Sequence, residues 1–84
     1  MQKRPHALID AVSLIFGTKT DVELADRLLS SAGTVSRIRK GTQSVSAELI
    51  LRINDRTGLS LDAIYDLLKE EKARRRRQAK ESRL

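Results

Sequence analysis

ELADRLLSSAGTVSRIRKG, residues 23–41, contains the helix patterns from which the fold of this 84-residue chain is inferred. It follows Thr20, whose hydroxyl can accept a free backbone N–H, and Glu23 completes a capping box three residues later. The apolar residues after this start recur at helical spacing on one face; they are Leu24, Ala25 and Leu28. The pattern predicts a short helix that begins after Thr20.

The second half of this stretch predicts another helix. Residues 29–30 interrupt the first pattern, and Ser31 can cap a new start. Val35 and Ile38, three residues apart, would point inward, and Gly41 would end the helix as glycine commonly does. The opposite face would then present small and basic side chains, namely Ala32, Gly33, Ser36, Arg37 and Lys40.

The corner between these two helices is too short for them to run antiparallel, so they are expected to cross steeply. The second helix is then free to enter a DNA major groove, which is wide enough for one helix. Its first turn also offers free N–H groups and a partial positive charge to phosphate. The stretch therefore predicts sequence-specific binding of double-stranded DNA.

A set of residues between Thr20 and Leu68 keeps the spacing of a known family. They are Glu23-Leu24-Ala25, Ser31, Thr34-Val35-Ser36-Arg37-Ile38, Gly41, Ser46, Glu48-Leu49 and Gly58-Leu59-Ser60-Leu61-Asp62. In these residues the segment resembles the Cro/cI-type (XRE) helix-turn-helix family, over more than half of the chain. The resemblance implies an all-α, five-helix, lambda-repressor-like domain. It also implies a small transcriptional regulator of a kind frequent in phages and mobile elements.

Departures from the family pattern bear on which residues read the bases. Leu29 stands at the corner, where the family usually has glycine, and Asp21 stands where many members have a phosphate-contacting glutamine. Ala32 and Gly33 occupy the first reading positions, where polar side chains are common. We therefore expect the dominant readers further along the helix. The predicted base-contact residues are Ala32, Gly33, Thr34, Ser36 and Arg37.

Individual contacts follow from side-chain chemistry. Ala32 could touch a thymine methyl, and Arg37 could reach a guanine edge. Gly33 costs roughly 1 kcal/mol of helix stability relative to alanine, and close approach to DNA or simple drift would each explain it. Polar residues around the second helix, including the loop that lies along a DNA strand in the family, are predicted phosphate contacts. They are Lys19, Thr20, Ser31, Lys40, Thr42, Gln43 and Ser44.

Composition bounds the other function classes. The chain is long enough for one domain, has no cysteine, and has no apolar run of the ~20 residues that span a membrane, so we expect a cytoplasmic protein. A net charge of +6 suits nucleic acid, and two aromatic residues are too few for base stacking on single strands. The lone histidine, His6, is expected to be solvated. Without a convergent acid cluster we expect no enzyme, cofactor, metal or small-molecule substrate.

Three further helices are expected as scaffold. The first begins at Pro5 and ends before Gly17. The fourth is capped by Ser46 and ends at Gly58, and the fifth is capped by Ser60. Their expected core stripes are Leu8, Ile9, Val12, Ile15 and Phe16, then Leu49, Ile50 and Ile53, then Leu61, Ile64, Leu67 and Leu68. The candidate dimer contacts are Leu51, Tyr65 and Leu68.

Positive charge is concentrated near the end of the chain. Residues 1–68 hold nine Lys/Arg and eight acids, whereas residues 69–84 hold eight Lys/Arg and three acids. We therefore expect a DNA-binding domain at 1–68 and a basic tail, helical or disordered, at 69–84. The arginines at 74–77 have three interpretations: a nonspecific phosphate-binding arm, a solvated extension, or a contact for RNA or a partner protein. A short basic arm with Lys3 and Arg4 could touch phosphate or be disordered.

These expectations combine into a homodimer that places two copies of the second helix in successive major grooves of an inverted repeat. The half-site centres would lie about 34–36 Å apart, which is one turn of DNA. Occupying a promoter would block polymerase, which favours a repressor over an activator. Two alternatives stay open: a protein-interaction or antitoxin-like module, and RNA binding through the arginine-rich tail.

Overall fold

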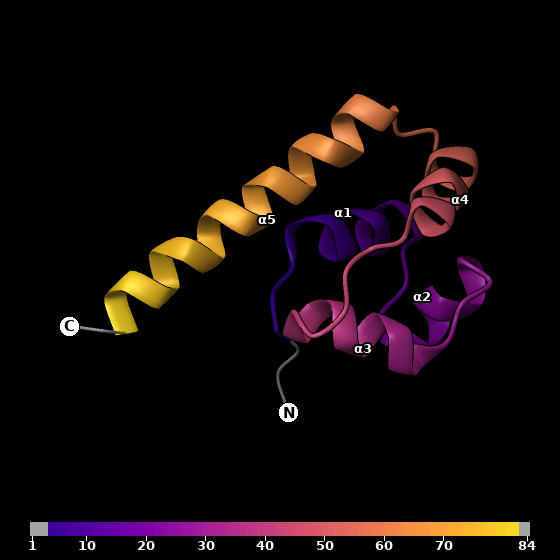
Figure 1. Ribbon diagram of the computed structural model, residues 1–84. Helices are drawn as coiled ribbons and strands as arrows, with labels where there is room; N and C mark the ends of the chain where they lie inside the picture. The colour runs from indigo at the N-terminus through magenta and orange to yellow at the C-terminus, as the bar shows by residue number, and fades with distance from the viewer. Residues whose placement is uncertain (1–3, 83–84) are drawn as a thin grey trace.

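The computed structural model describes residues 4–82, with side chains to residue 80, and contains helices but no strand in that range. The described residues form five helices, and Figure 1 shows that α5 is much the longest. The all-α, five-helix prediction is confirmed. The bounds are α1 Ala7–Phe16, α2 Asp21–Arg27, α3 Ala32–Lys40, α4 Ala47–Thr57 and α5 Leu61–Ser82.

The core lies where α1 packs against α2, α4 and α5, while α3 packs on α2. Every helix contributes at least one buried apolar side chain, so the helices share one core. Full burial of such a side chain stabilises the fold by about 1.5–3 kcal/mol. The buried apolar residues are Leu8, Ile9, Val12, Leu24, Ala25, Leu28, Val35, Ile38, Leu49, Ile50, Ile53 and Ile64.

The helix starts follow the predicted caps. Thr20, Ser31, Ser46 and Ser60 each accept, on the side-chain oxygen, the backbone N–H three residues later, at 3.1 Å. Each such bond satisfies one N–H that the first turn of a helix leaves unpaired. Because these caps need only local sequence, they fix where four of the helices begin.

The start of α1 differs from the prediction. Pro5 was expected as the first helical residue and His6 as a solvated side chain, but α1 begins at Ala7 and His6 is its cap. His6 Nδ1 accepts the Ile9 N–H at 3.3 Å, and the imidazole is only 4% exposed. Its cover comes from α5, where Glu71 is also buried. The partner lies far away in sequence, which is why local patterns missed it.

Two residues expected in the core are at the surface. Ile15 is 48% exposed and Leu61 is 40% exposed. Both have the helical spacing of a buried position, but Ile15 lies in the last turn of α1 and Leu61 is the first residue of α5. Spacing gives the side of a helix that faces inward, and it does not say whether a neighbour covers that side at the helix end.

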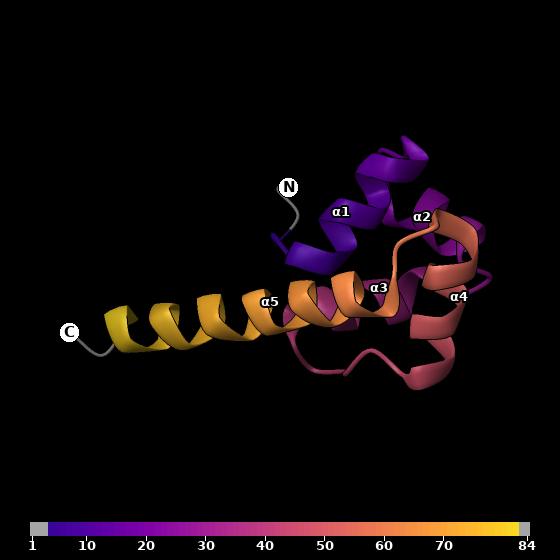
Figure 2. The same cartoon turned by 90° about the horizontal axis from the view of Figure 1, so that it is seen from above.

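Helix α5 crosses the predicted domain boundary at residues 68–69 without a break and continues to Ser82. Its middle is part of the domain, because Glu71 is 4% exposed against α1. Beyond Arg75 the helix projects past the other four helices, as Figures 1 and 2 show in two views. The predicted arm residue Lys3 and the tail residue Arg83 lie outside the described residues.

Candidate nucleic-acid interface

The corner between α2 and α3 is made without glycine. Leu29 adopts a left-handed backbone with φ of 52°, and its side chain is 64% exposed. This conformation costs a residue with a Cβ roughly 1–2 kcal/mol, which is the physical reason that glycine is common at such corners. Arg52 of α4 holds the corner, because its Nη1 donates to the carbonyls of Leu28 and Leu29 at 3.0 and 3.2 Å. This role of Arg52 was not predicted from the sequence.

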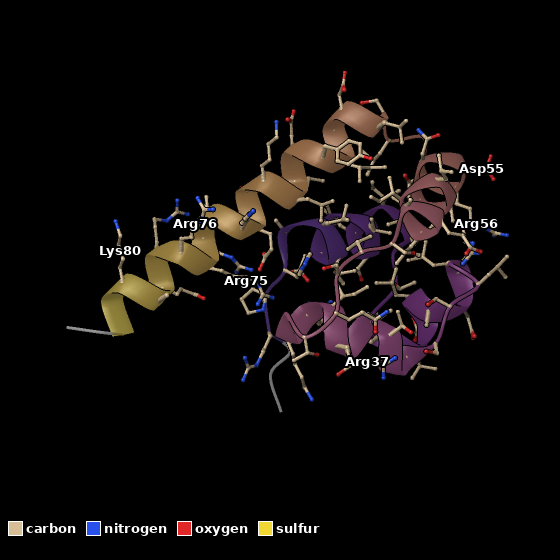
Figure 3. The ribbon with its side chains drawn as sticks, viewed as in Figure 1. Arg37, Asp55, Arg56, Arg75, Arg76 and Lys80 are labelled. Carbon is tan, nitrogen blue, oxygen red and sulfur yellow. The ribbon has the colours of Figure 1, made fainter. Side chains whose placement is uncertain are left out.

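Helix α3 presents the face that the spacing predicted. Val35 and Ile38 are buried, at 0% and 2% exposure, whereas Arg37 is exposed. Figure 3 shows Arg37 on the side of α3 that faces away from the other helices. The arrangement leaves a basic side chain on a free helix face above an apolar anchor, as groove reading requires.

A chain of hydrogen bonds runs along this face of α3. The Ser31 and Thr34 hydroxyls are 2.9 Å apart, and Arg37 Nη2 donates to Thr34 Oγ1 at 3.4 Å. Arg37 Nε donates to Gln43 Oε1 in the following loop at 2.7 Å. The chain joins two of the predicted base-contact residues to two of the predicted phosphate-contact residues. The Arg37–Gln43 pair itself was not predicted.

Gly33 lies directly beside the Arg37 guanidinium. A Cβ built at position 33 would stand 3.2 Å from Arg37 Nη1, closer than side chains usually approach. Glycine here gives the guanidinium room to lie along the helix, an explanation that the sequence alone did not suggest. Of the five predicted base-contact residues, two are exposed and three are half-buried. The exposed pair is Gly33 and Arg37, and the half-buried residues are Ala32, Thr34 and Ser36.

The predicted phosphate-contact residues are all exposed. Their environments differ, since the Thr42 hydroxyl donates to the Arg37 carbonyl at 3.3 Å, whereas Gln43 and Ser44 line a polar cavity of about 230 Å³. This cavity lies between α3 and the start of α4, and hydroxyl and amide groups from both sides face it. The seven residues are Lys19, Thr20, Ser31, Lys40, Thr42, Gln43 and Ser44.

Arg39 is the anchor of α3, a role that was not predicted from the sequence. It is 6% exposed, and its Nε donates to both carboxylate oxygens of Asp21 at 3.0 and 3.1 Å. Its Nη1 donates to Asp10 Oδ1 at 2.7 Å and to the Arg4 carbonyl at 2.8 Å. Three helices therefore meet on one guanidinium. Asp21, which departs from the family's glutamine, has a structural partner here.

The end of α3 is held by α5. Arg75 donates from Nη2 to the Arg39 carbonyl at 2.7 Å and from Nη1 to the Lys40 carbonyl at 3.3 Å. These are carbonyls of the last turn of α3, which has no helical partner for them. Gly41 makes the approach possible, because a Cβ there would stand 1.9 Å from Arg75 Nη1.

Glu71 fixes Arg75 in this position. It accepts the Ala7 N–H at 2.8 Å and the Arg75 Nε at 2.7 Å, and Arg74 also donates to it. Burial alone would raise the pKa of Glu71, but these hydrogen bonds outweigh burial and lower the pKa overall. Two of the four consecutive arginines are thus committed to holding the fold, and Figure 3 shows Arg76 and Lys80 on the side of α5 away from α3.

The neighbouring titratable groups respond to the same cluster. Burial lowers the pKa of His6, only partly offset by the negative charge of Glu71. For Asp10, burial would raise the pKa, but the hydrogen bond from Arg39 and the one from the His6 backbone lower it overall. The cluster therefore favours neutral His6 between two ionised carboxylates.

Two capped helices at a tight corner, with a free basic face on the second, define a helix-turn-helix domain that binds double-stranded DNA. A family model, described as the bacteriophage CI repressor helix-turn-helix domain, matches residues 7–73. The chain belongs to that family and is a DNA-binding transcription regulator, not a member of an enzyme family. Searches of curated proteins and of solved structures return no match. Within residues 4–82, no helix is long and apolar enough to cross a membrane.

Proposed function

We propose that the protein is a repressor that binds as a homodimer to an inverted repeat in cytoplasmic DNA. The observation that supports this most is the exposed Arg37 face of α3 above buried Val35 and Ile38. Each copy would place α3 in a major groove, where Arg37 reads a guanine edge. The description of the family as a repressor domain supports repression over activation. A dimer bound at a promoter would repress by excluding polymerase.

The phosphate contacts in this proposal flank α3 on both sides. Ser31 and Thr20, at capped helix starts, would meet one strand with their neighbouring N–H groups. The polar cavity between α3 and α4, with Ser44 at its edge, would receive the other strand. Glu48 also lines this cavity, and its pair with Arg52 at 2.8 Å offsets its charge. Lys19, Lys40 and Thr42 complete the set.

The proposed dimer contacts are apolar side chains at the surface, except that Leu68 also packs partly against the shared core. Leu51 is 59% exposed and Tyr65 is 48% exposed, whereas Leu68 is half-buried. Covering them with a second copy would remove apolar surface from water, which favours association. Two copies related by a twofold axis also match the symmetry of an inverted repeat.

Selecting bound duplexes from a random DNA pool tests the proposal as a whole. We expect an inverted repeat with half-site centres about 10–10.5 base pairs apart. Placing the selected site over a promoter should then lower transcription in a purified system. A pool without an enriched motif contradicts specific binding, a single asymmetric site contradicts the homodimer, and increased transcription contradicts repression.

The outward charges of α5 would add nonspecific attraction for DNA. Arg74 and Arg75 bind within the fold, so truncating the chain before them would damage the domain itself. Arg76→Gln with Lys80→Gln is the sharper variant. It should weaken binding to all duplexes and lower the salt slope by about 0.9 for each phosphate that the variant no longer neutralises. Arg56→Gln on α4 is the control, and a salt slope equal to that of the unmodified protein would rule out DNA binding by α5.

A further inference from the structure

We propose that Gln43 is a positioning residue that sets the base preference of the protein by fixing how Arg37 presents its guanidinium. The inference rests on the proposed function, in which Arg37 reads a base. From the sequence, Gln43 was predicted to contact phosphate. In the structure its side-chain oxygen accepts the Arg37 Nε proton at 2.7 Å, a length typical of charge-assisted bonds.

The bond leaves one way for Arg37 to read a base pair. A guanidinium can donate two parallel hydrogen bonds through Nε and one Nη, or through its two Nη groups. Gln43 accepts from Nε and Thr34 from one proton of Nη2, so the donors that remain are the second Nη2 proton and the two Nη1 protons. With these protons, Nη1 and Nη2 fit the O6 and N7 acceptors of guanine. Arg37 therefore approaches the base with the Nη end of its guanidinium, and the orientation of the guanidinium plane is fixed before DNA binds.

Two further residues keep the guanidinium along α3. Thr34 Oγ1 accepts from Arg37 Nη2 at 3.4 Å, and Thr34 is tied to the capping residue Ser31 at 2.9 Å. Gly33 leaves space for the guanidinium, because a Cβ at position 33 would stand 3.2 Å from Arg37 Nη1. The guanidinium thus lies toward the start of α3, which is the part of a recognition helix that meets base edges.

This arrangement separates two roles that a loop glutamine could have. A phosphate contact strengthens binding to every sequence, whereas an orienting contact strengthens binding only where the oriented group finds its base. Ordering Arg37 before binding removes part of the entropy cost of the specific complex. Loss of Gln43 should therefore lower discrimination at the base pair that Arg37 reads.

The test uses the full chain and the duplex selected above, with substitutions at each base pair. Arg37→Ala should lower the ratio of specific to nonspecific affinity by about 100-fold, within the range of a bidentate contact. Gln43→Leu should lower it by about tenfold, at the same base pair, with an unchanged salt slope. Gln43→Glu keeps the acceptor oxygen and should retain the ratio, while repulsion from phosphate weakens all binding. Gln78→Leu on α5 is the matched control.

A readout in the free protein checks that the effect comes from orientation. The NMR signal of the Arg37 Nε proton should be protected from solvent exchange, lose that protection in Gln43→Leu and keep it in Gln43→Glu. A Gln43→Leu protein that binds all duplexes more weakly, with its base preference intact, would make Gln43 a phosphate contact and overturn the inference alone. An unchanged preference in Arg37→Ala would overturn the proposed reader together with the inference.

Discussion

The outer face and the inner end of α3 carry the same residue type in opposite environments. Arg37 is exposed and bound to two neutral side chains, whereas Arg39 is buried and bound to two carboxylates. The two arginines are two positions apart, so the helix turns one outward and the other under itself. A basic residue on a recognition helix can therefore serve the reading surface or the scaffold, and its partners decide which.

Removing each arginine in turn should have different effects on the stability of the fold. Arg39→Ala should lower the free energy of unfolding by about 2–4 kcal/mol, because it removes the guanidinium that bonds Asp21, Asp10 and the Arg4 carbonyl. Arg37→Ala should change it by less than about 0.5 kcal/mol. Urea titration followed by circular dichroism measures both. Equal effects on stability would mean that the buried ion pairs do not anchor α3.

The contact between the C-terminal end of α3 and Arg75 can be tested by substituting Gly41. Gly41 has φ of 83°, and a Cβ would collide with Arg75. Gly41→Ala should therefore cost about 2 kcal/mol, from the left-handed backbone and the displaced guanidinium together. In an Arg75→Ala background only the backbone part remains, so the loss should be smaller. The same loss in both backgrounds would show that Arg75 does not pack on this turn.

The pH dependence of folding stability tests His6, the cap of α1, which lies in the same cluster as Glu71 and Arg75. His6 has a lowered pKa when folded, so the unfolded chain takes up its proton first as the pH falls. The contribution of neutral His6 to folding stability is fully present above the ordinary histidine pKa of 6.5. It is lost as the pH falls from there through the lower pKa of the folded state. Protonation also removes the cap on Ile9, a bond of a kind worth about 1 kcal/mol.

His6→Asn keeps a capping oxygen without a proton to gain, so its stability should be flat over this window. The measurement is the midpoint of thermal unfolding of both proteins at several pH values from about 7 to about 5, a range around the ordinary histidine pKa. If the stability of the unmodified protein depends on pH as little as that of His6→Asn, His6 is not the source of the pH dependence. Further loss is expected below the ordinary pKa values of 4.5 for Glu71 and 3.8 for Asp10, whose folded pKa values are lowered.

The smallest expected effect lies at the corner that leads to the outer face. Leu29→Gly removes the left-handed strain but adds freedom to the unfolded chain, for a net gain of about 0.5–1 kcal/mol. The exposed side chain loses little packing. Denaturant unfolding measures the gain, with Leu51→Gly, an exposed leucine inside α4, as a control that should lose stability. A loss in Leu29→Gly would mean that the Leu29 side chain stabilises the corner.

The parts of the fold that sequence predicts here are the local ones. Thr20 and Ser31 cap helices through bonds to N–H groups three residues away, and Val35 and Ile38 face inward by spacing alone. Each depends on geometry within one or two turns. The same holds for the outward direction of Arg37, which carries the proposed site.

The parts that sequence missed depend on distant partners. Arg39 finds Asp21 across 18 positions, and Ala7 finds Glu71 across 64. One local signal did exist, since Arg39 follows Val35 by four residues and so shares its inner face. His6 offered none, because its burial depends on α5. The Gln43 contact with Arg37 depends on the path of a loop, which helical spacing does not describe.

The grip of Arg75 on the last carbonyls of α3 has a consequence for synthesis of the protein. Ribosomes make the reading helix early, but its clamp is among the last parts of the domain to emerge. A nascent chain that ends before position 75 carries α3 without this support. Chains that terminate before position 75 therefore lack the donor for the last carbonyls of α3, and we expect that turn to fray in them.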